Sequence, residues 1–90
     1  MERAEISLHQ LRVFRFVADA NTWLTNREIA HGLNMRERTV RAHTKRFVDL
    51  GIFDQAEVFP AHKFRLSGQA RKRNIGFMNR LNSAAEVFGL

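Results

Sequence analysis

The chain has no cysteine and a single proline among its 90 residues. Without cysteine it can form no disulfide and no thiolate-bound metal site. No apolar run approaches the roughly 20 residues that a membrane-spanning helix needs. The first ten residues, MERAEISLHQ, lack the apolar segment of a signal peptide. We therefore expect a cytoplasmic protein.

Patterns that carry catalysis or hold a metal are missing as well. The four histidines, at positions 9, 31, 43 and 62, do not have the spacing of metal ligands. There is no nucleophile elbow, no phosphate-binding glycine loop and no paired carboxylate site. We therefore expect neither an enzyme nor a bound metal or cofactor. No small-molecule site is evident in the sequence either.

The positive charge is concentrated in the middle of the chain. The net charge is +6, and the segment from Arg36 to Arg73 holds ten basic and four acidic residues. The remaining residues are balanced, so this segment carries the whole excess. Clustered positive charge is typical of nucleic-acid binding, although a solvated basic face is the common alternative. The length and the 44% hydrophobic content predict one folded domain over residues 1–90.

Local signals predict three helices in the first half of the chain. Ser7 with Gln10, and Thr25 with Glu28, have the spacing of capping boxes. Apolar residues at helical spacing follow each box, which predicts helices over about 7–20 and 25–33. A third helix is predicted over about 36–50, ending at Gly51. Trp23, between the first two helices, is expected in the core.

The third helix is predicted to be amphipathic. At about 100° per residue, Val40, Thr44, Phe47 and Leu50 share one side of it. The opposite side is rich in arginine and lysine. A helix of this kind buries one side in the core and leaves a basic side outward.

The second half of the chain predicts a hairpin and a final helix. Residues 63–67, KFRLS, alternate polar and apolar side chains as a half-buried strand does. This predicts a two-strand hairpin over about 56–67, with its turn near Pro60. Ser67 is then expected to cap a long helix over about 68–88. The predicted fold class is mainly α with a small β-hairpin.

The order of these elements, with the stretch LTNREIAHGLNMRERTVRAHTKRFVDLGIF at 24–53, resembles the winged helix-turn-helix DNA-binding domains of bacterial and phage transcriptional regulators. The residues in the typical positions of that family are Thr25, Ile29, Ala30, Leu33, Thr39, Val40, Leu50, Gly51 and Ile52. Two positions depart from it. Arg36 stands where relatives often have a Ser or Thr cap, and Thr44 where Leu is more usual. Thr44 implies a looser core or a hydroxyl bonded to the preceding turn.

The resemblance implies that the 36–50 helix reads the major groove and that the 56–67 hairpin, the wing, meets phosphates or the minor groove. The residues expected to contact DNA from the helix are Arg36, Arg38, Thr39, Arg41, Ala42, Lys45 and Arg46. Those expected to contact DNA from the wing and other elements are Arg27, His62, Lys63, Arg65 and Arg71. For Arg65 and Arg71, a solvated position is the alternative.

The 68–88 helix has more apolar surface than a single packing contact needs, which predicts a homodimer interface. The residues expected there are Phe77, Met78, Leu81, Ala85 and Phe88. The alternative is a monomer in which this helix folds over its own core.

Taken with the charge, the resemblance implies sequence-specific binding of double-stranded DNA by a small regulator, expected to be a repressor, in the cytoplasm of a bacterial cell or phage-infected host. The alternative is a protein-interaction or architectural module of phage or plasmid replication or recombination, because winged helices serve both purposes.

Overall fold

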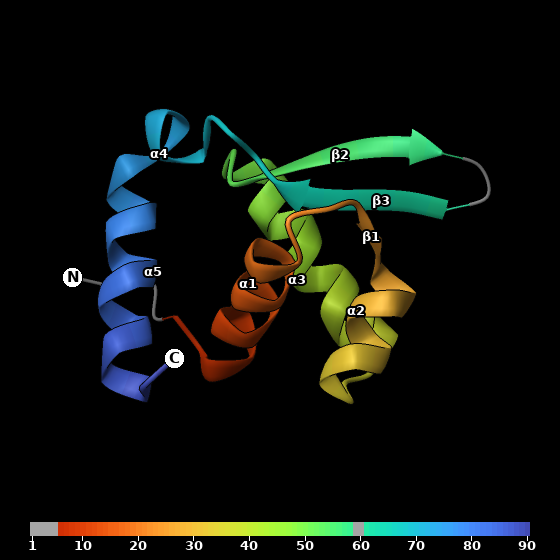
Figure 1. The fold of residues 1–90 in the computed structure, drawn as a ribbon, viewed down its shortest axis with the longest axis horizontal. Coiled ribbons are helices and arrows are strands. Elements are labelled where there is room, and N and C mark those ends of the chain that lie inside the picture. The colour runs from red at the N-terminus through yellow and green to blue at the C-terminus, as the bar shows by residue number, and fades with distance from the viewer. Residues whose placement is uncertain (1–5, 59–60) are drawn as a thin grey trace.

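The computed structural model describes residues 6–58 and 61–90. The elements follow in the order α1 (Leu8–Ala20), β1 (Leu24–Thr25), α2 (Asn26–Leu33), α3 (Glu37–Asp49), β2 (Phe53–Val58), β3 (Ala61–Leu66), α4 (Ala70–Arg73) and α5 (Ile75–Phe88). Figure 1 shows α1 between α5 and α2, with the sheet lying across one end of the helices. Mainly helical structure with a small sheet confirms the predicted fold class. No helix among the described residues is long and apolar enough to cross a membrane.

Both predicted capping boxes are present. The Ser7 hydroxyl accepts from the Gln10 backbone N–H at 3.1 Å, and the Gln10 side chain accepts from the Ser7 N–H at 3.0 Å. Thr25 and Glu28 make the same reciprocal pair at 3.0 and 2.9 Å. Each box satisfies two backbone donors that the first helical turn leaves free. The predicted starts of α1 and α2 are therefore confirmed.

The turn from α2 to α3 and the end of α3 use left-handed residues. Asn34 ends α2 with φ 55°, and Gly51 follows α3 with φ 79°. Asparagine and glycine adopt this conformation at the lowest cost. Arg36 is the N-cap of α3 and makes no side-chain capping bond. The departure at Arg36 thus leaves this helix without a side-chain cap.

The sheet has three strands, one more than predicted. β2 and β3 pair antiparallel from Phe53↔Leu66 to Val58↔Ala61. β1 joins the other edge of β3 through Leu24↔Phe64 and Thr25↔Lys63. Two residues are too few for alternation to reveal a strand. The hairpin also begins at 53 and not at 56, and the turn predicted near Pro60 lies outside the described residues.

Phe47 of α3 stands at the centre of the core. Its side chain is fully buried, and its ring centroid lies 4.8 Å from that of Phe53, 6.1 Å from that of Phe14 and 6.1 Å from that of Phe77. These rings come from β2, α1 and α5. Aromatic pairs at such separations stabilise a core beyond the area that they bury. The apolar side predicted for α3 is thereby confirmed, and its polar outer side is left free.

The long C-terminal helix predicted over 68–88 is broken at Asn74. This residue has φ −154° and ψ 71°, which ends α4 and precedes α5. Its Oδ1 accepts from the Phe77 N–H at 3.1 Å, and its Nδ2 donates to the Leu50 carbonyl at 3.3 Å. Ser67 does not cap a long helix: its hydroxyl accepts from the Gln69 N–H at 3.0 Å. The helix breaks at Asn74 because its side chain caps α5 and also hydrogen-bonds to the end of α3.

Trp23 is only half-buried, so its predicted place in the core is wrong. The Arg65 guanidinium carbon lies 5.5 Å from the centroid of the Trp23 ring. A cation over an aromatic face is an attractive arrangement that does not need full burial. Arg65 therefore covers part of the Trp23 ring that the core leaves open.

Candidate nucleic-acid interface

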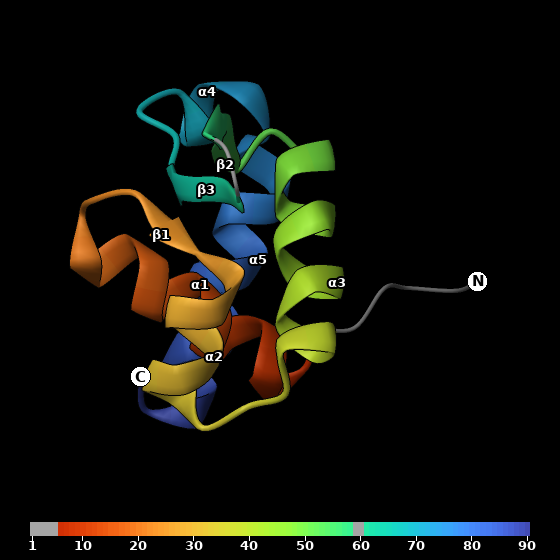
Figure 2. The ribbon, with the colours of Figure 1, turned by 90° about the vertical axis from the view of Figure 1, so that its right-hand side faces the viewer.

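The outer side of α3 is basic and uncovered. Figure 2 shows this helix along one edge of the molecule, with its outer side away from the other elements. Six of the seven residues predicted to contact DNA from it are exposed, and they are Arg36, Arg38, Arg41, Ala42, Lys45 and Arg46. Thr39 is half-buried. The structure thus places Arg38, Arg41, Ala42 and Lys45 together on one accessible side of α3.

Two of these basic side chains have a carboxylate partner one turn away. Arg41 Nη2 lies 3.2 Å from Glu37 Oε2, and Lys45 Nζ lies 3.4 Å from Asp49 Oδ2. All four side chains are between 46% and 77% exposed. Exposed pairs of this spacing contribute only about 0.2–0.5 kcal/mol each. Arg41 and Lys45 can therefore leave their partners at little cost when a stronger anion approaches.

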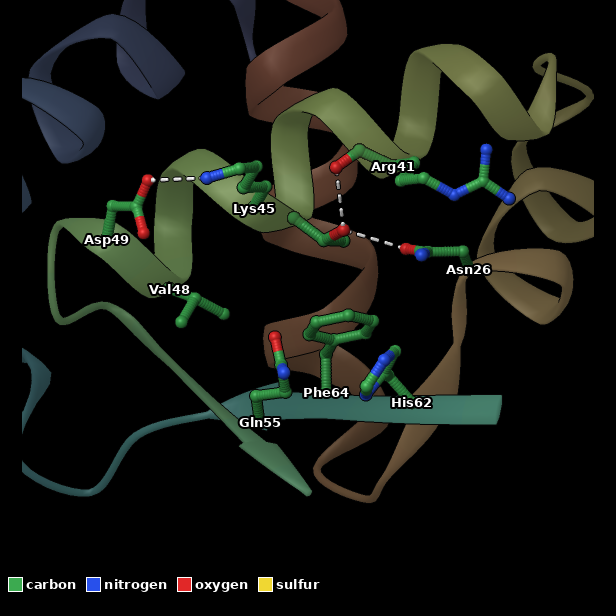
Figure 3. Close-up of a pocket in the computed structure, with 9 residues that line it drawn as sticks. Asn26, Arg41, Lys45, Val48, Asp49, Gln55, His62 and Phe64 are labelled. Carbon is green, nitrogen blue, oxygen red and sulfur yellow. Dashed lines mark hydrogen bonds and ion pairs between the residues drawn. The ribbon is translucent and has the colours of Figure 1, made fainter. Parts of the chain in front are cut away.

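A groove of about 440 Å³ separates α3 from the wing (Figure 3). Arg41 and Lys45 line it from α3, His62 and Phe64 from β3, and Asn26 from the start of α2. A second groove of about 450 Å³ adjoins it and is lined by Arg27 in addition to Asn26, Arg41 and His62. Four of the predicted contact residues, from α2, α3 and β3, therefore lie around one region of the surface.

The wing divides its predicted contact residues between two faces. Successive side chains of a strand point to opposite faces of the sheet. His62 and Phe64 line the groove beside α3, so Lys63 and Arg65 lie on the other face. Both are half-buried, and Arg65 covers Trp23. Of the wing residues predicted together, only His62 lies next to α3.

Three further predicted residues, Arg71, Arg36 and Thr39, lie apart from this region. Arg71 belongs to α4, where its Nη1 donates to Asn79 Oδ1 at 3.2 Å. Arg36 and Thr39 line a smaller hollow of about 200 Å³ at the start of α3, together with His9 and Arg12 of α1. Arg12 also holds α2 in place, because its Nη2 donates to the Leu33 carbonyl at 2.8 Å.

Four of the five residues predicted at a dimer interface are buried within the chain. Phe77, Met78, Leu81 and Ala85 are between 0% and 8% exposed, whereas Phe88 is 48% exposed. Helix α5 packs along α1, so the stripe that looked surplus in the sequence fills the core of its own chain. Among the residues whose side chains the structure describes, the exposed large apolar ones are Leu8, Ile75, Val87, Phe88 and Leu90.

A polar contact that the sequence did not reveal joins α2 to α3. Thr44 is fully buried, and its hydroxyl donates to Asn26 Oδ1 at 2.7 Å. The Arg41 carbonyl of the preceding turn lies farther from the same hydroxyl, at 3.2 Å. The expected bond to the preceding turn is present, but the shorter bond crosses to α2. No local sequence signal points to Asn26, since its partner is 18 residues away.

His43 lies on the side of α3 that faces α1. It is half-buried, and burial lowers its pKa, with nearby His9 and Arg46 acting in the same direction. His43 is therefore neutral near pH 7 and adds no charge to the basic side of the helix. Among the described residues no cluster of three or more His, Asp or Glu side chains could hold a metal ion.

A scan of protein-family models and a search of curated proteins found no match. Solved structures do match. The ST1889 protein of the archaeon Sulfolobus tokodaii is 18% identical, with a TM-score of 0.69 over 93% of this chain and 81% of its own. A MarR family protein of Bacillus stearothermophilus is 15% identical, with a TM-score of 0.61 over 93% of this chain and 60% of its own.

The adhesin competence repressor AdcR of Streptococcus pyogenes is 16% identical, with a TM-score of 0.62 over 94% of this chain and 64% of its own. The chain thus spans less than two thirds of both bacterial proteins. At these identities the likeness is one of fold. Three helices, a two-strand wing and an uncovered third helix, together with these neighbours, identify the chain as a winged helix-turn-helix domain.

Proposed function

We propose that this domain binds double-stranded DNA as part of a transcriptional regulator and is not an enzyme. The observation that carries the proposal is the outer side of α3, where Arg38, Arg41 and Lys45 are exposed together on the second helix of a helix-turn-helix. The major groove admits one such helix. A protein-interaction module would instead favour an exposed apolar patch at this place.

In this proposal the residues divide into two roles. Arg38 and Arg41, near the start of α3, reach base edges, where an arginine can bond guanine O6 and N7 together. Ala42, next to Arg41 in the chain, allows close approach or contact with a thymine methyl. Arg27 and His62, which border the grooves beside α3, contact backbone phosphates. Lys63 and Arg65, on the other face of the wing, contribute less.

We also propose that the regulator is a repressor and that it binds DNA as a homodimer. AdcR, one of the structural neighbours, is a repressor, which supports the same direction of regulation here. A symmetric dimer would present two copies of α3 to two half-sites. The exposed apolar side chains near the end of α5, Val87, Phe88 and Leu90, would supply its contacts. Sedimentation equilibrium should then show a dimer that a Val87→Ser and Phe88→Ser double variant dissociates.

The test of DNA binding is fluorescence anisotropy with a labelled duplex across a salt series. Wild type is compared with Arg41→Ala and with Arg15→Ala. Arg15 is an exposed arginine of α1, paired with Asp19 at 3.6 Å, and it lines none of the three grooves described above. Both variants lose one positive charge, so only the position of the charge differs.

We expect Arg41→Ala to weaken binding by about tenfold or more and Arg15→Ala by less than about twofold. The affinity of wild type should fall steeply with salt because binding releases counterions. Equal losses in the two variants would mean a diffuse attraction without a defined surface. No binding at low salt would remove the proposed function.

A further inference from the structure

We propose that Asn26 is a phosphate-binding residue of this surface and that Thr44 positions it. The ligand is one backbone phosphate of DNA, bound where α2, α3 and the wing meet. This inference rests on the proposed function and adds to it two residues, neither of which the sequence placed at the DNA surface.

The position of Asn26 is the first observation. It is the first residue of α2, and it lines both of the grooves beside α3. The residues common to the two grooves are Asn26, Arg41 and His62. They come from three different elements, and Figure 3 shows them around the same opening. An amide, a guanidinium and an imidazole in one place each offer at least one N–H donor.

The orientation of the amide is the second observation. An asparagine side chain offers one acceptor oxygen and one NH₂ group with two donors. The buried Thr44 hydroxyl occupies the oxygen at 2.7 Å. No hydrogen bond from Asn26 Nδ2 is present within the described residues, and no buried polar atom there lacks a partner. Nδ2 is therefore not enclosed by the protein, and both of its N–H donors are free.

The two carboxylates that line the grooves, Glu37 and Asp49, are each paired with a cation of α3, so the unpaired groups around Asn26 favour an anion. Arg27 adds a second guanidinium to the 450 Å³ groove. Lys45 lines the 440 Å³ groove. On DNA the matching group is the phosphate, which accepts charge-assisted hydrogen bonds. A phosphate is the same in every sequence, so Asn26 should set affinity and register and leave base preference unchanged. This separates its role from that of Arg41.

Thr44 acts through Asn26 and not on DNA, because its side chain has no exposed surface. The hydroxyl also explains why a polar residue stands at a core position of α3. With valine there, nothing would fix the amide, and it would rotate freely. A positioning residue of this kind is recovered by the conservative variant Thr44→Ser, which keeps the hydroxyl.

The first experiment measures the affinity of four variants for one duplex, with thermal unfolding of each protein alongside. Asn26→Asp keeps the acceptor for Thr44 but turns the donor into an anion, so we expect unchanged thermal stability and at least about tenfold weaker binding. Asn26→Ala and Thr44→Val should each weaken binding about three- to tenfold. Thr44→Ser should bind like wild type. The ranking of different duplexes should stay the same throughout.

The second experiment locates the phosphate. Single phosphates of the duplex are replaced in turn by uncharged methylphosphonates. Wild type should lose affinity at the contacted position, and Asn26→Ala should lose less at that position and equally elsewhere. This comparison holds even if Asn26→Asp fails to fold, since each protein is its own reference.

The outcomes separate this inference from the proposed function. If wild type binds DNA and Asn26→Asp binds as tightly, or if Asn26→Ala shows the same methylphosphonate profile as wild type, Asn26 is not a phosphate contact and the proposed function stands. If wild type itself binds no DNA, the proposed function fails, and this inference fails with it.

Discussion

Glu37 and Arg41 form an ion pair across one turn of α3, with 3.2 Å between Oε2 and Nη2. The pair lies on the surface proposed to face DNA, so the carboxylate opposes the approach of phosphates. It also holds the arginine in one orientation before DNA arrives.

Replacing Glu37 with glutamine should strengthen binding to all duplexes by several-fold and make the salt dependence steeper, because one negative charge leaves the surface. Stability should change by no more than about 0.5 kcal/mol, as expected for an exposed pair. Anisotropy and urea unfolding measure the two effects. Asp19→Asn, in the equivalent pair on α1, is the matched control and should leave DNA binding unchanged.

Phe47 is predicted to be the most costly apolar side chain to remove. It is fully buried between three other rings. Phe47→Ala should lower the free energy of unfolding by about 3–5 kcal/mol, a large part of the stability of a domain this size. Urea denaturation followed by circular dichroism measures it. Phe88→Ala, at a side chain 48% exposed, should cost far less. Similar losses at both positions would contradict the described core.

The cap that Asn74 provides should by itself contribute about 1 kcal/mol to the free energy of unfolding. Asn74→Ala removes both the bond to the Phe77 N–H and the bond to the Leu50 carbonyl. Asn74→Asp retains the first, so its loss should be smaller. The exposed Asn82 of the same helix is the control, and Asn82→Ala should not destabilise the protein. Equal stability of Asn74→Ala and wild type would mean that the break between α4 and α5 is not held by this side chain.

Because the pKa of His43 is lowered, we expect the protein to lose stability in mild acid. Burial lowers its pKa in the folded chain below the ordinary value of 6.5. The unfolded chain therefore binds the proton first as pH falls, and the contribution of His43 is full above pH 6.5 and is lost as pH falls through the folded pKa. Unfolding of wild type and His43→Gln from pH 8 to 5 measures this. The pH dependence should be weaker in the variant, whereas His31→Gln, at an exposed position, should behave like wild type.

Signals within a few residues predicted much of the fold. The capping boxes at Ser7 and Thr25 and the left-handed Asn34 depend on neighbours three or four residues away, and all three are present. β1 and the break at Asn74 were missed because they depend on distant partners. Leu24 pairs with Phe64, and Asn74 donates to a carbonyl 24 residues away.

The site was predicted in part for the same reason. Helical spacing placed Arg38, Arg41 and Lys45 on one side of α3, because that pattern is local. The alternation of β3 could have separated His62 from Lys63 and Arg65, but their shared charge grouped them. The buried stripe of α5 did not reveal what covers it, since α1 and a second chain both fit an apolar stripe. In the structure, α1 covers this stripe of α5.

The central claim is that the outer side of α3 reads DNA bases, and selection from random-sequence duplexes tests it most directly. Wild type, Arg41→Ala and Arg27→Ala are each used to enrich a library, and affinities for the recovered motif and for random DNA are compared. We expect one motif for wild type and loss of preference at one G·C position in Arg41→Ala, by about 1–3 kcal/mol. Arg27→Ala should keep the motif and bind every sequence more weakly. No enriched motif, or the same motif with unchanged preference in Arg41→Ala, would contradict it.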